Sequence, residues 1–149
     1  MTEPSGQNTY PAPGQVPATA GEVMRPALTA VAPNDHVAAA AYLMKRADAT
    51  SMVVIGDEKA RKPVGLITEA DIVRAVADGK NLNEVRILAL MTRDPAVIRT
   101  TASIREAARI MVAGHFRHLP VTDDDGSLRG MADILDICEA LLGSPEAGP

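Results

Sequence analysis

The chain contains an internal repeat, whose second copy begins 67 residues after the first, so that Met91 corresponds to Met24. Similar residues return in the same order, and each copy closes with a glycine, a short apolar pair and an aspartate. A repeat of this kind indicates the architecture before any single motif does. A unit of roughly 60 residues buries only about 60% of its unfolded surface, so we expect the copies to share one core. The matched segments are 23–26 with 90–93, 37–44 with 104–111, 52–54 with 119–121, and 65–71 with 130–136.

Composition excludes several classes of function. The chain is 46% hydrophobic and 23% charged with a net charge of −4, which gives no reason to expect a nucleic-acid partner. The aromatic residues, Tyr10, Tyr42 and Phe116, are too few for base stacking. No apolar run approaches the roughly 20 residues that cross a bilayer, and residues 1–20 lack the features of a signal peptide. We therefore expect a cytoplasmic protein with no nucleic-acid or membrane partner.

Repeat and composition together divide the chain into five parts. Residues 1–20 are rich in proline, glycine, threonine and glutamine, a composition that predicts a disordered tail. Residues 143–149 are predicted to be a flexible tail as well. Between the tails we expect a first repeat at 21–78, a linker at 79–86 and a second repeat at 87–142.

Each copy shows the pattern short strand, helix, strand, strand, helix, which predicts an α+β fold. Apolar residues recur with helical spacing over 37–44 and 104–111. Asn34 or Asp35 is available to cap the first of these helices, and Ser103 with Glu106 is a capping box for the second. Gly143 is in the position of a C-terminal cap. The remaining predicted elements are strands at 52–55, 64–68, 119–122 and 128–132, and helices at 69–77 and 134–142.

The second copy has a strong hairpin signal at Asp125-Gly126. The preceding acids, Asp123 and Asp124, superficially resemble a calcium loop. The spacing and the closing glutamate of an EF-hand are absent, however. A hairpin turn is the better interpretation of this run.

Catalytic and metal-binding chemistry find little support in the sequence. Three histidines, His36, His115 and His118, are scattered over different predicted elements, and the single Cys138 lies far along the chain from them. Cys138 is within an apolar helical stripe, which predicts a buried small residue rather than a nucleophile. A single cysteine also argues against a disulfide framework. We therefore predict no enzyme activity, no metal site and no required cofactor.

The duplicated pattern resembles the cystathionine-β-synthase-type (CBS) domain pair. The resemblance covers about residues 21–142 and rests on the Met24-Arg25-Pro26 opening, the Arg-His-Leu-Pro-Val run at 117–121 and the glycine-to-aspartate endings. It implies a disc-shaped module of two β-α-β-β-α repeats packed pseudo-symmetrically, with two clefts that bind AMP, ADP, ATP or S-adenosylmethionine. A homodimer is also implied by the family, together with a protein partner that the sequence does not identify.

The resemblance assigns ligand roles to residues that also have simpler interpretations. Asp71 and Asp136 match the aspartate that holds the ribose hydroxyls, and Thr68 matches the hydroxyl residue that contacts phosphate at a helix start. Carboxylates suit this role because hydrogen bonds to charged groups contribute about 1.5–3 kcal/mol each. Thr68 and Asp71 are equally well explained as a helix cap with an acid at its third position.

The two copies differ where phosphate would lie. Position 133 is an aspartate where the first copy has Thr68, and a phosphate about 4 Å away would meet repulsion of roughly 1–4 kcal/mol. By the resemblance, Arg117 and His118 reach the cleft of Thr68 and Asp71, where their basic groups suit phosphate. A solvated surface explains this basic pair as well. We predict one nucleotide-competent cleft and one that is empty or takes a ligand without phosphate there.

Two functional hypotheses remain. The first is a non-catalytic regulatory module that binds an adenosine-containing ligand in the cleft between the repeats and signals to a protein partner. The second is a protein-interaction or dimerisation module with vestigial clefts. Asp71 with Arg117 favours the first hypothesis, and Asp133 favours the second.

Overall fold

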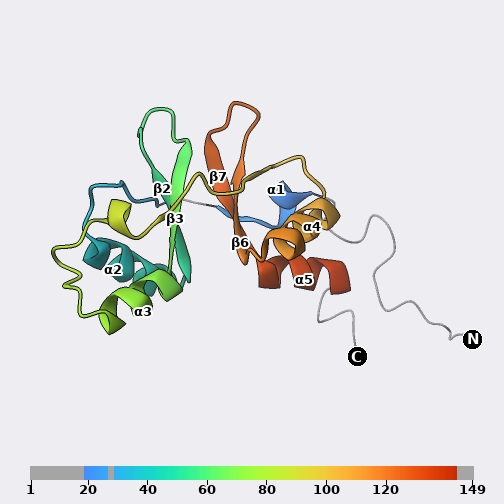
Figure 1. The fold of residues 1–149 in the computed structure, drawn as a ribbon. Helices are drawn as coiled ribbons and strands as arrows, with labels where there is room; N and C mark the ends of the chain where they lie inside the picture. The colour runs from blue at the N-terminus through green and yellow to red at the C-terminus, as the bar shows by residue number, and fades with distance from the viewer. Residues whose placement is uncertain (1–18, 27–28, 144–149) are drawn as a thin grey trace, which may run out of the picture. The chain divides into compact units, whose positions relative to one another are not determined.

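The computed structural model describes residues 19–26 and 29–143, so most of both predicted tails lies outside the described residues. Helices and strands alternate in the order predicted for each repeat, which confirms the α+β class (Figure 1). The first repeat contains β1 (Arg25–Pro26), α2 (Val37–Ala47), β2 (Ser51–Ile55), β3 (Pro63–Thr68) and α3 (Glu69–Ala77). The second contains β4 (Thr92–Arg93), α4 (Ile104–Gly114), β6 (His118–Thr122), β7 (Leu128–Asp133) and α5 (Ile134–Leu142). Three short elements complete the described chain, namely α1 (Ala20–Val23), the 3-10 helix η1 (Ile87–Ala89) and β5 (Ile98–Arg99).

The chain divides into two compact units whose boundaries differ from those of the sequence repeats. Unit 1 comprises residues 19–26, 97–124 and 129–143, and unit 2 comprises residues 29–96 and 125–128 of the described chain. The short strand that opens each repeat joins the sheet built from the other repeat, because β1 pairs with β7 and β4 pairs with β3. Apart from residues 125–128, the turn of the second repeat's hairpin, each unit therefore combines the strands and helices of one repeat with the opening segment of the other.

Unit 2 is built on the antiparallel sheet β2-β3-β4. Every residue of β2 is buried, as its continuous apolar run predicts. The 3-10 helix η1 contributes the fully buried Ile87 to this core, although it belongs to the opening segment of the second repeat. The buried core consists of Val31, Val37, Ala40, Met44, Met52, Val54, Ile67 and Ile87.

Unit 1 is built on the sheet β1-β7-β6-β5 and repeats the pairing of unit 2. The parallel pair Ile98 with Val121 lies 67 residues after the parallel bridge of Val31 with Val54. Ala20, at the end of the predicted tail, is fully buried at the start of α1. The buried apolar residues of this unit include Ala20, Ile98, Ile104, Ala107, Met111, Leu119, Val121, Ala132 and Ile137.

Helix ends follow the predictions in part, since α4 has the Ser103 half of the predicted capping box, without the reciprocal bond from the Ser103 amide to the Glu106 side chain. The Ser103 hydroxyl accepts a hydrogen bond from the Glu106 amide at 3.0 Å, and Gly143 ends α5 with a φ of 91°. The predicted cap of α2 at Asn34 or Asp35 is wrong, because His36 is the N-cap residue. The Asp35 carboxylate instead accepts a hydrogen bond from the amide of Ala32, which holds the preceding turn.

The turn between β6 and β7 has the geometry that its sequence predicts. Gly126 adopts a φ of 87°, in the left-handed region that favours glycine. The Asp125 carboxylate accepts hydrogen bonds from the amide and the hydroxyl of Ser127 at 2.9 and 2.7 Å. These hydrogen bonds, the backbone one foremost, lower the pKa of Asp125. The run of acids therefore forms a stabilised turn.

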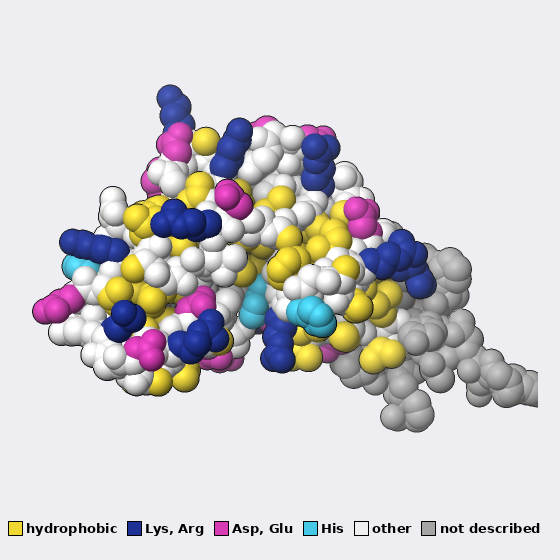
Figure 2. All heavy atoms as spheres, in the orientation of Figure 1, with side chains coloured by type: hydrophobic (Ala, Val, Ile, Leu, Met, Phe, Trp, Pro, Cys, Tyr) yellow, Lys and Arg dark blue, Asp and Glu magenta, His cyan; other side chains and the backbone are white. Residues whose placement is uncertain are grey.

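Charged side chains of both signs are interspersed over the face drawn in Figure 2. This distribution agrees with the modest net charge of −4, and the face shown has no continuous basic stripe of the kind that binds a phosphate backbone. None of the helices in residues 19–26 and 29–143 has the length and apolar character that a bilayer crossing requires.

Candidate functional site

Thr68 lies where β3 ends and α3 begins in unit 2. It pairs with Ser51 across the hairpin and has extended backbone angles, so it is the N-cap residue of α3. The next amide, that of Glu69, donates to the carbonyl of Thr50 at 3.0 Å, which ties the helix start to the residue that precedes β2. The hairpin therefore fixes the position from which α3 projects.

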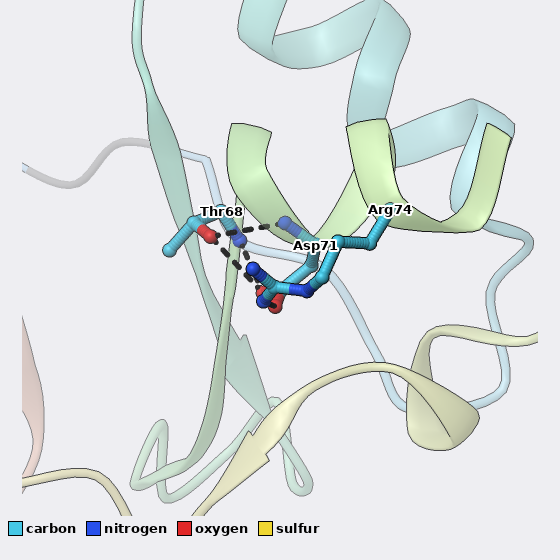
Figure 3. Close-up of polar contacts among 3 residues, drawn as sticks. All are labelled: Thr68, Asp71 and Arg74. Atoms are coloured by element: carbon cyan, nitrogen blue, oxygen red, sulfur yellow. Dashed lines mark hydrogen bonds and ion pairs between the residues drawn. The ribbon is translucent and has the colours of Figure 1, made fainter. Parts of the chain in front are cut away.

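Asp71 and Thr68 form a reciprocal capping box (Figure 3). Asp71 Oδ2 accepts hydrogen bonds from the Thr68 amide at 2.9 Å and from the Thr68 hydroxyl at 3.1 Å. The Asp71 amide in turn donates to the same hydroxyl oxygen at 3.4 Å. The capping interpretation of these two residues is thus realised in this structure.

Arg74 is the remaining partner of the Asp71 carboxylate (Figure 3). Its guanidinium donates to Asp71 Oδ1 at 2.8 Å from one turn along α3. The Arg74 side chain is 70% exposed, whereas that of Asp71 is 12% exposed. A carboxylate offers about four acceptor positions, so a ribose diol needs at least one existing partner to leave. The exposed ion pair is the least costly to break, since pairs of this kind contribute only about 0–1 kcal/mol.

The corresponding carboxylate in unit 1, Asp136, has different surroundings. Asp133 caps α5 by accepting a hydrogen bond from the Leu135 amide at 2.7 Å, so position 133 has no hydroxyl to donate. Asp136 Oδ2 is buried and accepts no hydrogen bond from the described residues. Its charge is matched by Arg25 of β1, whose Nε lies 3.4 Å away. Asp136 is therefore an incompletely satisfied acceptor, unlike Asp71.

Arg117 and His118 begin β6 in unit 1 and have separate surroundings. The Arg117 carbonyl accepts a hydrogen bond from the Ile134 amide at 2.9 Å, which fixes the backbone at the start of α5. Its side chain is exposed, and its guanidinium has no carboxylate partner within the described part of the chain. His118 Nε2 lies 3.7 Å from Asp133 Oδ2.

The predicted site residues thus fall into two local groups. Thr68 and Asp71 are hydrogen-bonded to each other in unit 2. In unit 1, His118 lies beside Asp133, and the Arg117 carbonyl accepts a hydrogen bond at the start of α5. The predicted contact of Arg117 and His118 with the site of Asp71 stays a prediction.

Sequence reasoning missed the two arginines that pair with the candidate carboxylates. Arg74 was available from the i, i+3 spacing to Asp71 on a predicted helix. Arg25 has no local signal, because it lies 111 positions before Asp136 in the sequence. Only the pairing of β1 with β7 brings these two residues together.

The prediction for Cys138 is wrong, because its side chain is exposed on α5 rather than buried. The stripe that packs inward is centred on the neighbouring Ile137, which is 1% exposed. Over residues 19–26 and 29–143, no group of three or more histidine, cysteine, aspartate or glutamate side chains is placed to hold a metal ion.

Two curated relatives match most of the chain. A protein of Methanopyrus kandleri is 32% identical over 120 residues, which are 80% of this chain and 60% of the relative. A protein of Acidianus ambivalens is 37% identical over 112 residues, covering 75% of this chain and 66% of the relative. The chain thus spans less than two thirds of the length of each of these curated relatives.

Solved structures agree with this relationship. CBSX2 of Arabidopsis thaliana, in a crystal structure with AMP, matches with a TM-score of 0.71 and 27% identity over 85% of this chain and 97% of CBSX2. The sequence model of the CBS domain matches residues 20–78 and 86–143, which include both candidate carboxylates. With two matched copies that together cover most of the sequence, the chain belongs to the CBS domain family and carries a tandem pair of these domains.

Proposed function

We propose that the chain is a non-catalytic regulatory module of the cytoplasm that binds an adenosine-containing ligand and signals to a protein partner. The ligand belongs to the class of AMP, ADP and ATP, with S-adenosylmethionine as a further possibility, and no other cofactor is required. Thr68 and Asp71 form its principal site, and Asp136 forms a second site of different selectivity.

One observation carries the proposal. The carboxylate of Asp71 is held in a fixed position at the first turn of α3 while its outer partner, Arg74, is exposed and easily displaced. Oδ1 can therefore accept ribose hydroxyls after Arg74 leaves, and Oδ2 keeps the capping bonds that orient the group. Hydrogen bonds from hydroxyls to a carboxylate contribute about 1.5–3 kcal/mol each, which exceeds the value of the lost exposed pair.

The similarity to CBSX2 supports the class of ligand. That protein was crystallised with AMP and covers 85% of this chain. The amides of Thr68, Glu69 and Asp71 are already engaged at the start of α3, so the feature that favours an anion there is the positive end of the helix dipole. An AMP-like ligand would combine this dipole with the Asp71 carboxylate.

We further propose that Arg117 contributes to phosphate binding at the principal site. Its guanidinium is exposed and has no ion-pair partner among the described residues, so phosphate would not have to displace a carboxylate. His118 contributes less, because Asp133 of its own unit is already 3.7 Å away. At the second site Asp133 disfavours phosphate through like-charge repulsion.

Calorimetric titration with AMP, ADP, ATP and S-adenosylmethionine tests the proposal. We expect saturable binding that weakens about tenfold or more in Asp71→Asn, a variant that keeps an oxygen for the capping bond but loses the charge. Glu69→Gln, which removes a neighbouring charge from the same helix turn, is the matched control and retains affinity. Absence of binding by all four ligands to the folded protein would contradict the proposal.

The alternative function, dimerisation or partner binding alone, is favoured by apolar side chains on the outer faces of the helices. Val73 and Val76 of α3 are 64% and 58% exposed, and Leu135 and Leu142 of α5 are 72% and 60% exposed. Such residues are candidates for an interface, including that of a homodimer. Sedimentation of Val73→Asp and Leu135→Asp measures this role. If the protein is an interaction module, these two variants lose the assembly, whereas Asp71→Asn leaves the assembly unchanged.

A further inference from the structure

Both candidate carboxylates have an arginine partner in their own unit, but the two arginines come from different parts of the chain. Arg74 lies on the same helix as Asp71, so its displacement leaves the fold of unit 2 in place. Arg25 lies on β1, the strand that the first repeat contributes to unit 1, and pairs with Asp136. Displacement of Arg25 would therefore act on the docking of another segment.

Asp136 depends on Arg25 more than Asp71 depends on Arg74. The buried Oδ2 of Asp136 accepts no hydrogen bond from the described residues, and the Asp133 side chain is engaged with the Leu135 amide. Arg25 Nε at 3.4 Å supplies the opposite charge. A buried acceptor that is left incomplete is unfavourable, so hydroxyl donors that complete it would compete with the guanidinium.

The segment that carries Arg25, residues 19–26, is held on unit 1 by backbone hydrogen bonds, by the pairing of β1 with β7 and by the buried Ala20. The Ala20 amide donates to the Ala102 carbonyl at 2.7 Å, and the Gly21 amide donates to the Thr100 carbonyl at 2.9 Å. The strand β1 itself has only two residues. A short segment of this kind opens locally more readily than a central strand, so the loss of one ion pair is measurable there.

We propose that Arg25 couples occupation of the Asp136 site to the docking of residues 19–26. A nucleoside whose ribose hydroxyls bond to Asp136 takes the carboxylate from Arg25, and the segment loosens. The proposal rests on the second site of the proposed function. Residues 19–26 belong to unit 1, and the chain continues from them into the sequence of unit 2.

The direction of coupling follows from differential affinity, since the ligand binds Asp136 better when Arg25 has left it. The Arg25 side chain is 68% exposed, and exposed pairs have small effects. We therefore expect the coupling to be about two- to fivefold in equilibrium constant.

In the absence of ligand, hydrogen exchange at the Ala20 and Gly21 amides measures how firmly residues 19–26 are docked on unit 1. We expect Arg25→Ala and Asp136→Asn each to accelerate this exchange about two- to fivefold, and the double variant to add nothing further. Arg109→Ala, which removes an exposed arginine of α4 in the same unit, is the control and leaves the exchange unchanged. Equal exchange in all variants, or additive effects in the double variant, would overturn the proposal.

The effect of ligand binding on the docking of residues 19–26 is tested with adenosine. The Asp71→Asn variant is used, so that Asp136 is the remaining candidate carboxylate. Saturating adenosine is expected to accelerate exchange at Ala20 and Gly21 by the same factor, and to have no effect when Arg25→Ala is also present. Binding by calorimetry without acceleration overturns the coupling and leaves the proposed function intact. Failure of adenosine to bind refutes the second site, while AMP binding to the unmodified protein still decides the principal one.

Discussion

Gly130 of β7 lies very close to the backbone of β1, the strand that the first repeat contributes to unit 1. A Cβ at this position would lie 2.5 Å from the Arg25 carbonyl oxygen and 2.6 Å from the Met24 sulfur. Gly65, its counterpart in β3, would place a Cβ near the flexible side chain of Met91, with the Thr92 carbonyl oxygen at 3.1 Å. Backbone yields less easily than the end of a methionine, so Gly130→Ala is the more disruptive change.

We expect Gly130→Ala to destabilise the protein by about 2–3 kcal/mol, in the range of overpacking substitutions, and Gly65→Ala by about 1 kcal/mol or less. For a chain of this size, a loss of 2–3 kcal/mol lowers Tm by about 4–12 °C. Thermal unfolding measures this difference between the two variants.

Hydrogen exchange identifies the part of the molecule that Gly130→Ala affects. Because β1 must move away from β7, the Ala20 and Gly21 amides are expected to exchange about 30- to 150-fold faster, which corresponds to 2–3 kcal/mol. If Gly130→Ala matched Gly65→Ala in Tm and left these two amides protected, the close approach of β1 to β7 would be refuted.

Three further predictions concern unit 2. Ile87→Ala should destabilise the protein by about 2–5 kcal/mol, because it removes a fully buried side chain. Denaturant unfolding measures this loss. If amide protection were lost in unit 1 instead of in α2 and β2, the packing of this second-repeat segment in unit 2 would be contradicted. Thr68→Ala should cost about 1 kcal/mol through loss of the cap, and Thr68→Ser should restore most of the stability measured by the same unfolding experiment. Arg74→Ala should strengthen AMP binding by up to about fivefold in calorimetry, because it removes a competing ion pair, whereas weaker binding would assign Arg74 to a contact with the ligand.

The elements that the sequence predicts well are those with strong local signals. The helix at 69–77 agrees with α3 because its apolar spacing, its N-cap Thr68 and the following turn all point to the same boundaries. The helix at 134–142 agrees with α5, which Gly143 terminates. At α2 two candidate caps compete within three residues, and the Asp35 side chain bonds to the preceding turn, so the boundary falls at His36.

Local patterns could not predict that the opening strand of each repeat pairs with the sheet of the other repeat. Both copies have the same short strand followed by the same helix, so pairing within a copy and pairing between copies have the same sequence signal. The structure resolves this ambiguity through the register of β1 with β7 and of β4 with β3.

The candidate site shows the same division between local and distant relationships. Thr68 and Asp71 are three residues apart, and their capping contacts follow from that spacing. The partner of Asp136 is Arg25. The two residues would not be close if β1 paired with a strand other than β7. Local chemistry could be read from the sequence, and charge pairing between distant segments could not.

The measurement that tests the account most directly compares AMP with its 2′-deoxy analogue in the unmodified protein and in Asp71→Ala. If Asp71 holds the ribose, the unmodified protein prefers AMP by about tenfold or more, because one hydrogen bond to a carboxylate contributes about 1.5–3 kcal/mol. Asp71→Ala then binds both ligands weakly and without preference. Equal affinity for both ligands in the unmodified protein, or a preference that persists in Asp71→Ala, would contradict the assignment of Asp71 as the ribose-binding residue.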